Sequence, residues 1–113
     1  MDIKVRVYRF AVAVVKFCAS VPDNKISAPL VNQLIRCGTS VGANVIEAQA
    51  ASSRRDFLKF IQIALKSANE TKFWLCLVRD GLEVNSEVLK NLLEEAVEIS
   101  RILGASTLTL KKG

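Results

Sequence analysis

An unbroken apolar stripe constrains the fold of this chain more than any other feature. Between residues 57 and 82, apolar or small side chains recur at alternating steps of four and three: Phe57, Ile61, Ala64, Ala68, Thr71, Leu75, Val78 and Leu82. This repeat predicts one long helix that packs against other helices at an angle of about +20°. Ser53 and Asp56 form a capping box at its start.

Three other segments carry the helical period. Residues 3–21 have a stripe of Ile3, Val7, Phe10, Val14, Phe17 and Val21. Residues 27–51 begin with Ser27 as the N-cap and Pro29 in the first turn, and their stripe is Leu30, Leu34, Cys37, Val41, Val45 and Ala48. The last begins at Asn85 or Ser86, ends at Gly104, and has a stripe of Leu89, Leu92, Ala96, Ile99 and Leu103.

Short connections make successive helices antiparallel. The sequence therefore predicts an all-α fold, an up-down-up-down antiparallel four-helix bundle over residues 1–104, followed by a flexible basic tail over residues 105–113.

Gly38 and Gly42 lie inside the second predicted helix, one turn apart. Each costs about 1 kcal/mol relative to alanine, so a compensating reason is needed. We expect a flat patch where another helix approaches closely; the alternative is a kink or hinge.

The third predicted helix has a second line of mostly apolar side chains: Phe60, Ile63, Ser67, Trp74 and Leu77. A helix that is apolar on two sides is covered on two sides. The second cover is a neighbouring helix or another subunit. We predict an oligomer interface at Phe60, Ile63, Trp74 and Leu77.

Composition narrows the class of protein. The 113 residues have 16 basic and 11 acidic side chains, a net charge of +5, which allows an acidic partner such as nucleic acid. The cysteines Cys18, Cys37 and Cys76 fall at apolar helical positions, which indicates reduced thiols in a cytoplasmic protein. The run FAVAVV between Arg9 and Lys16 is too short for a membrane span of about twenty residues.

The residue types argue against an enzyme. The chain has no histidine and no glycine-rich phosphate loop. Glu94, Glu95 and Glu98 form an acidic cluster, which we interpret as a solvated surface. We predict no catalytic residue, no metal site and no cofactor.

Polar side chains follow one line of the second helix: Arg36, Ser40, Asn44 and Glu47. With the turn at Ser52 and Ser53, positions that face each other across the hairpin sum to about 105. This places Arg36 near Glu70, and Glu47 near Lys59 or Arg55. Structural ion pairs that fix the register are the first interpretation, and a polar recognition groove is the other.

Phe73 and Trp74 follow Lys72 and offer an aromatic, basic surface on which bases could stack. The other interpretation of Trp74 is an interface anchor.

The runs RCGTSVGANVIEAQ and SxxDFLKFIQIALKSANETKFWL resemble the signature of bacterial four helix bundle proteins. That family includes members encoded in intervening sequences of large-subunit ribosomal RNA genes, and a distant relative is the accessory variability protein of diversity-generating retroelements. The resemblance implies a homo-oligomeric ring, typically a homopentamer, without enzymatic activity; the retroelement relative binds RNA and a reverse transcriptase. This sequence has Ser67 where similar members usually carry an acidic residue.

Two functions follow as hypotheses. One is an oligomeric accessory protein that binds RNA weakly through a basic rim, with Arg6, Arg9, Arg54, Arg55 and Lys59 as phosphate contacts. The other is a scaffold for a protein partner encoded by a neighbouring gene. In the up-down topology, one end of the bundle collects nine basic and four acidic side chains: Lys4, Arg6, Arg9, Arg54, Arg55, Lys59, Arg101, Lys111 and Lys112 against Asp2, Glu47, Asp56 and Glu98.

Overall fold

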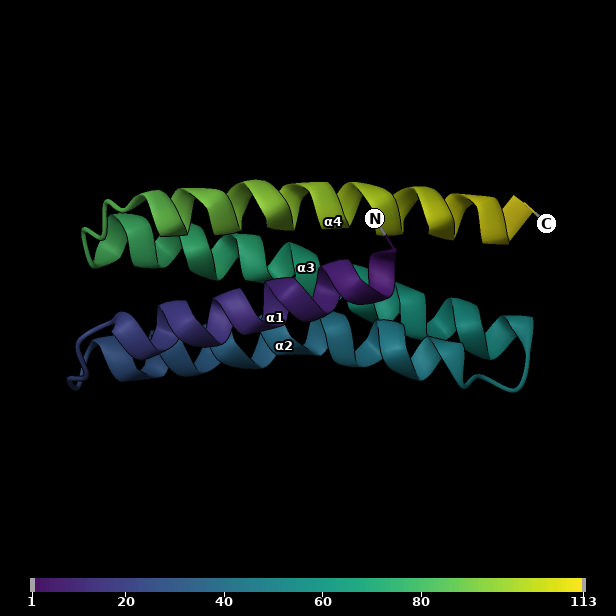
Figure 1. The fold of residues 1–113 in the computed structure, drawn as a ribbon, viewed down its shortest axis with the longest axis horizontal. Coiled ribbons are helices and arrows are strands. Elements are labelled where there is room, and N and C mark those ends of the chain that lie inside the picture. The colour runs from purple at the N-terminus through teal and green to yellow at the C-terminus, as the bar shows by residue number, and fades with distance from the viewer. Residues whose placement is uncertain (1, 113) are drawn as a thin grey trace.

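The computed structural model describes residues 2–112, which form four α-helices and no strand. The helices are α1 (Ile3–Ser20), α2 (Ser27–Gln49), α3 (Arg54–Gly81) and α4 (Glu87–Lys112). Each runs antiparallel to the one before it, in a body of 46 × 20 × 20 Å (Figure 1). Neighbours in sequence are neighbours in space, and α4 closes the bundle against α1. The predicted antiparallel four-helix bundle is confirmed, with α1 and α3 on diagonal corners.

The core consists of the predicted stripes. Its fully buried large side chains come from all four helices: Val7, Val14, Leu34, Val41, Val45, Thr71, Leu75, Val78, Leu89, Ile99 and Leu103. Residues at the ends of the stripes, such as Ile3, Leu30 and Leu82, are only partly buried. One cluster of buried residues therefore runs through the bundle, as is expected of helices packed against one another around one core.

The two glycines of α2 are the places where α1 comes closest. A Cβ atom on Gly38 would lie 2.8 Å from Cγ1 of Val14, and one on Gly42 would lie 3.3 Å from the carbonyl oxygen of Val7. Both positions are buried. The packing interpretation is confirmed, because any side chain would push α1 away from α2.

Side-chain caps fix the helix starts. The Ser53 Oγ accepts a hydrogen bond from the backbone N–H of Asp56 at 3.1 Å, and the Ser86 Oγ accepts one from Leu89 at 3.2 Å. The prediction for Ser27 is wrong. Asn24 Oδ1 accepts from the N–H groups of Ile26 and Ser27, both at 2.9 Å. Ser27 is instead the first residue of α2, and its buried hydroxyl donates to the carbonyl of Pro22.

The predicted end of the last helix at Gly104 is also wrong. α4 continues to Lys112, so residues 105–112, predicted as a tail, form its last turns. The stripe goes on past Leu103 because Thr107 is buried and donates its hydroxyl proton to the carbonyl of Leu103 at 2.9 Å. A threonine that satisfies its own hydroxyl can occupy a core position. Met1 and Gly113, at the ends of the two predicted domains, lie outside the described residues.

α1 is the shortest helix, with 18 residues against 28 in α3. Its start lies inside the bundle, short of the end formed by the α2–α3 turn and the last turns of α4 (Figure 1). Within residues 2–112, none of the helices has the length and apolarity needed to cross a membrane.

Candidate interaction surfaces

The basic end is the first candidate surface. We use this name for Arg54, Arg55, Lys59, Lys111 and Lys112, all exposed. The guanidinium of Arg54 donates to the backbone carbonyl of Leu110 at 3.4 Å, which ties the start of α3 to the last turn of α4. The acidic side chains on the same helix ends are Glu47 and Asp56, so five basic charges face two acidic ones.

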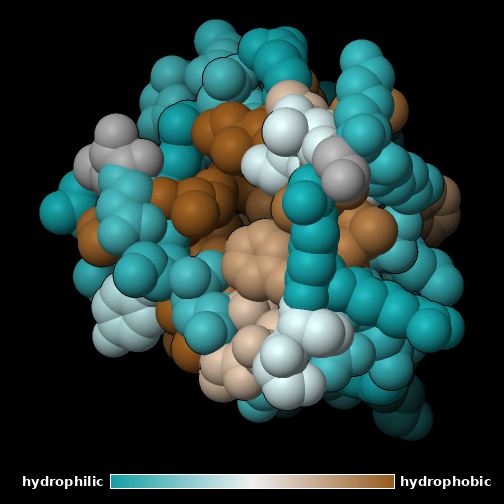
Figure 2. Space-filling model, turned by 90° about the vertical axis from the view of Figure 1, so that its right-hand side faces the viewer, coloured by the Kyte–Doolittle hydropathy of each residue, from teal (hydrophilic) through white to brown (hydrophobic). Residues whose placement is uncertain are grey.

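Figure 2 looks directly onto this end of the molecule. Hydrophilic side chains occupy most of its periphery, and hydrophobic atoms show between them near the centre. This pattern agrees with the position of α1, which begins short of this end of the bundle.

Two of the predicted phosphate contacts lie elsewhere. Arg6 donates two hydrogen bonds to the carboxylate of Glu95 on α4, from Nε at 2.7 Å and from Nη2 at 2.9 Å. This pairing raises the pKa of Arg6 above its ordinary value, chiefly through the hydrogen bonds to Glu95. Arg9 lines the groove between α1 and α4. The predicted collection of charge at one end is therefore wrong for α1, whose start lies beside the middle of α4.

Two of the three carboxylates of α4 that formed the acidic cluster in the sequence, Glu95 and Glu98, have structural partners. Glu95 holds Arg6, and Glu98 accepts from Arg101 at 2.8 Å, three residues along the same helix. Across residues 2–112, no group of three or more cysteine, aspartate or glutamate side chains is arranged to hold a metal ion.

The predicted ion pairs between α2 and α3 are not formed within residues 2–112, although the register is close to that expected. Ser67 donates its hydroxyl proton to the Ser40 Oγ at 3.0 Å, so facing positions sum to 107. Glu70 accepts a hydrogen bond from Nε1 of Trp74 at 3.1 Å instead of meeting Arg36. Glu47 and Lys59 are both exposed and are likewise not joined. Exposed charges gain little from pairing, which explains why register depends on smaller groups.

The aromatic pair on α3 does not form a basic stacking surface. Phe73 is 59% exposed and meets Trp74 edge to face, with 5.1 Å between ring centroids. The ammonium of Lys72, however, donates to the Ser100 Oγ on α4 at 3.1 Å. The cation is thus directed toward α4 and serves the α3–α4 contact.

The predicted oligomer interface divides into two parts. Phe60 and Trp74 are partly buried and pack against the core cluster. Ile63 and Leu77 are 37% and 38% exposed. The second apolar line of α3, residues 60–77, is therefore covered at its inner edge and open at its outer edge.

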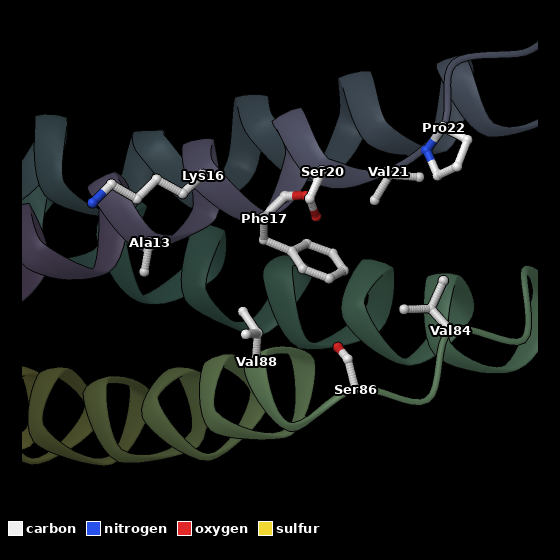
Figure 3. Close-up of a pocket in the computed structure, with 9 residues that line it drawn as sticks. All are labelled: Ala13, Lys16, Phe17, Ser20, Val21, Pro22, Val84, Ser86 and Val88. Carbon is white, nitrogen blue, oxygen red and sulfur yellow. The ribbon is translucent and has the colours of Figure 1, made fainter.

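A groove runs along the seam between α1 and α4, where the helices touch least. One part has a volume of about 450 Å³ and is lined mainly by apolar side chains, among them Ala13, Phe17, Val84 and Val88 (Figure 3). Phe17 extends from α1 toward α4 across this space, and Lys16 stands at its edge (Figure 3). A second part of about 350 Å³ shares Ala13 and Val88 and continues to Glu95.

The outer face of α1 is a feature that the sequence interpretation missed. We use this name for the residues at steps of three and four that alternate with the core stripe: Val5, Tyr8, Val12, Val15 and Ala19. Val5, Tyr8 and Val15 are 44%, 68% and 45% exposed, and Val12 is partly buried. The spacing of three, four, three and four is the signal that reveals this face, since it is the period of a helix seam.

Comparison with known proteins places the fold in a family. The model of the 23S rRNA-intervening sequence protein family matches residues 1–105. The chain belongs to this family. A crystal structure of a protein of unknown function from the S23 ribosomal protein family of Bacteroides thetaiotaomicron is 33% identical, with a TM-score of 0.86; the alignment covers 94% of this chain and 98% of that chain. No curated protein matches.

For this member of the 23S rRNA-intervening sequence protein family, Ser67 makes a polar link between α3 and α2. Its hydroxyl reaches Ser40, whose Oγ also accepts from the Asn44 amide at 3.0 Å. The carbonyl of Ser67 accepts from the buried hydroxyl of Thr71 at 2.7 Å. Every buried side-chain polar atom within residues 2–112 has a partner. Within the polar line of α2, Ser40 therefore provides a hydrogen-bonded contact to α3, and Asn44 supports it from the same helix.

Proposed function

We propose that this protein is a non-enzymatic homo-oligomer that binds single-stranded RNA weakly, with little sequence preference, through the basic end. The observation that carries this proposal is the convergence of Arg54, Arg55, Lys59, Lys111 and Lys112 around the Arg54–Leu110 hydrogen bond. Phosphate contacts of this kind supply affinity without reading bases. Assembly repeats the cluster on every subunit and strengthens its field.

The exposed side chains of Ile63 and Leu77 on α3 and the family resemblance support the oligomer. A pentameric ring is the form that the resemblance implies. The field of one subunit is modest, since the basic end carries a net of three positive charges. RNA binding is therefore expected to depend on assembly as well as on charge.

The test is RNA affinity measured by fluorescence anisotropy over a range of salt concentrations, with a labelled single-stranded RNA of mixed sequence. For the wild type, log K should fall linearly with log salt, with a slope of about −0.7 for each phosphate contacted. Reversal of Arg54 and Arg55 to glutamate should flatten the slope by about 1.4 if each side chain contacts one phosphate. Glutamates in the first turn of a helix are favourable, so α3 should still form.

The matched control reverses Lys25 and Lys90, two exposed lysines at the opposite end of the bundle. This variant has the same net charge as the first and should retain most of the affinity and the wild-type slope. Equal losses in the two variants would mean that only total charge matters. Unchanged binding by the Arg54 and Arg55 variant would reject the basic end as the RNA surface.

The groove between α1 and α4 favours a second candidate, a scaffold for a protein partner. A long apolar groove suits the apolar face of an amphipathic helix. Val88 lines both parts of the groove and is 54% exposed, so Val88→Asp should block docking without unfolding the bundle. A partner that is retained after nuclease treatment and lost with Val88→Asp would support the scaffold.

A further inference from the structure

The α1 side of the groove between α1 and α4 is positively charged. Arg9, Ala13 and Lys16 line it at steps of four and three, so two cations lie on one edge with a small residue between them. Both cations are exposed. The Lys16 ammonium makes no ion pair within residues 2–112. A molecule that lies in the groove therefore meets positive charge along about two turns of α1.

The α4 side of the groove differs from the α1 side. Val88 and Glu95 line it, and the Glu95 carboxylate is held by Arg6 at 2.7 Å. Glu87 and Glu94, one position before Val88 and Glu95 on α4, are exposed. The groove is thus apolar along its middle, positive along its α1 edge, and neutral or acidic along its α4 edge.

The shape of the groove suits a helix better than a small molecule. Its two parts, of about 450 and 350 Å³, share Ala13 and Val88 and are open to solvent on their outer side. Sites for small molecules usually enclose roughly 70 to 90% of the surface of their ligand. An open groove instead suits a partner that is apolar on one side only, as an amphipathic helix is. From Arg9 to Ser20, the α1 side is about 17 Å long, or three helical turns.

We propose that this groove binds an amphipathic helix of a partner protein that carries carboxylates along the edge facing α1. This inference rests on the scaffold, the second candidate function, and names the chemistry of its partner. Figure 3 shows Ala13 and Phe17 of α1 on one side of the space and Val88 of α4 on the other. The apolar face of the partner helix packs on these three residues, with a large side chain over Ala13, the smallest residue of the lining. Its carboxylates meet Lys16 and Arg9.

The test compares three labelled peptides in fluorescence anisotropy titrations of the whole protein. Each has about 18 mostly alanine residues, because shorter helices are marginal in water. All three share one leucine face, and they differ along one edge, which carries glutamate, glutamine or lysine. At low salt, the glutamate peptide should bind about tenfold more tightly than the lysine peptide, with the glutamine peptide between them. The difference should shrink as the salt concentration is raised.

Two variants with matched controls locate the binding. Lys16→Glu should remove most of the preference for the glutamate peptide, whereas Lys25→Glu, at an exposed lysine outside the groove, should preserve it. Ala13→Leu fills the middle of the groove and should weaken all three peptides equally. Its control is Ala19→Leu, at an exposed position of α1 that does not line this groove. Circular dichroism checks that each variant folds.

The outcomes separate this inference from the scaffold. Equal binding of the three peptides, all weakened by Ala13→Leu, would keep the groove as a docking site and refute its preference for an acidic helix. Absence of binding by any peptide would refute both. Binding that neither Ala13→Leu nor Lys16→Glu changes would place the peptides elsewhere and overturn the inference. Self-association of the wild type that Ala13→Leu abolishes would assign the groove to a second copy of the chain and would also overturn it.

Discussion

Replacement of Gly38 by alanine tests the close approach of α1 to α2. The added Cβ would lie 2.8 Å from Cγ1, 3.1 Å from Cγ2 and 3.4 Å from Cβ of Val14. Both methyl groups of Val14 face Gly38, so any rotation about χ1 leaves at least one of them there, and a valine in a helix strongly prefers one rotamer. Val14 is also fully buried. The two helices must therefore separate, at an overpacking cost of about 1 to 3 kcal/mol.

Alanine also has a favourable effect, because it is better than glycine inside a helix by about 1 kcal/mol. The net expectation for Gly38→Ala is a loss of about 1 kcal/mol in the free energy of unfolding. Gly104 provides the matched control, because it lies inside α4 and a Cβ there meets no atom within 4 Å. Gly104→Ala should raise the free energy of unfolding by about 1 kcal/mol.

The assay is urea denaturation followed by circular dichroism, at one protein concentration because self-association would shift the midpoint. The two variants should differ by about 2 kcal/mol, with opposite signs relative to the wild type. In the Gly38→Ala background, Val14→Ala should cost less than it costs alone, since it removes the clash. Equal stabilisation by both alanines would show that α1 does not approach α2 as the structure places it.

Two further predictions concern a helix cap and the cysteines. Ser53→Ala should lower the free energy of unfolding by about 1 kcal/mol, because Asp56 loses its hydrogen-bond acceptor, whereas Ser52→Ala in the preceding turn should cost less in the same urea assay. Burial raises the pKa of the Cys18 thiol to about 11, above its value in the unfolded chain. Between a pH of about 9 and 11 the unfolded chain therefore loses this proton while the folded chain keeps it, so the free energy of unfolding should fall as the pH rises through this range. A Cys18→Ala variant should lose less stability over that range, and mass spectrometry of briefly alkylated native protein should find Cys76, which is only partly buried, modified before Cys18.

Local periodicity was sufficient to predict the helices and the side of each that is buried. The stripe through Val7 and Val14, for example, needs no knowledge of what lies opposite, because the helical period alone brings its members to one side. The glycines of α2 were also interpretable, since a residue with a known cost inside a helix requires a packing reason. The end of α4 could not be predicted, because Thr107 is a polar residue that the helical stripe did not include, although the structure buries it.

Contacts between residues far apart in the chain could not be predicted from the sequence. Arg6 and Glu95 are 89 positions apart, and their pairing depends on how far α1 reaches along α4. An ideal up-down topology places the start of α1 at the end of the bundle, whereas the shorter α1 stops before it. Arg6 was therefore assigned to the basic end on topology alone. The cap at Asn24 was missed for a related reason, because its role depends on the path of the α1–α2 loop.

The two proposed surfaces lie on different parts of the subunit, and this separation has a consequence for how they would work together. The exposed apolar side chains of α3, Ile63 and Leu77, lie along that helix beyond its first turn, where Arg54 and Arg55 stand. A contact between copies through Ile63 and Leu77 would therefore leave Arg54 and Arg55 uncovered. Rotation about an axis along the bundle would bring the basic ends of all copies to one rim. Leu77→Asp should then weaken RNA binding through lost multivalency while each subunit keeps its phosphate contacts.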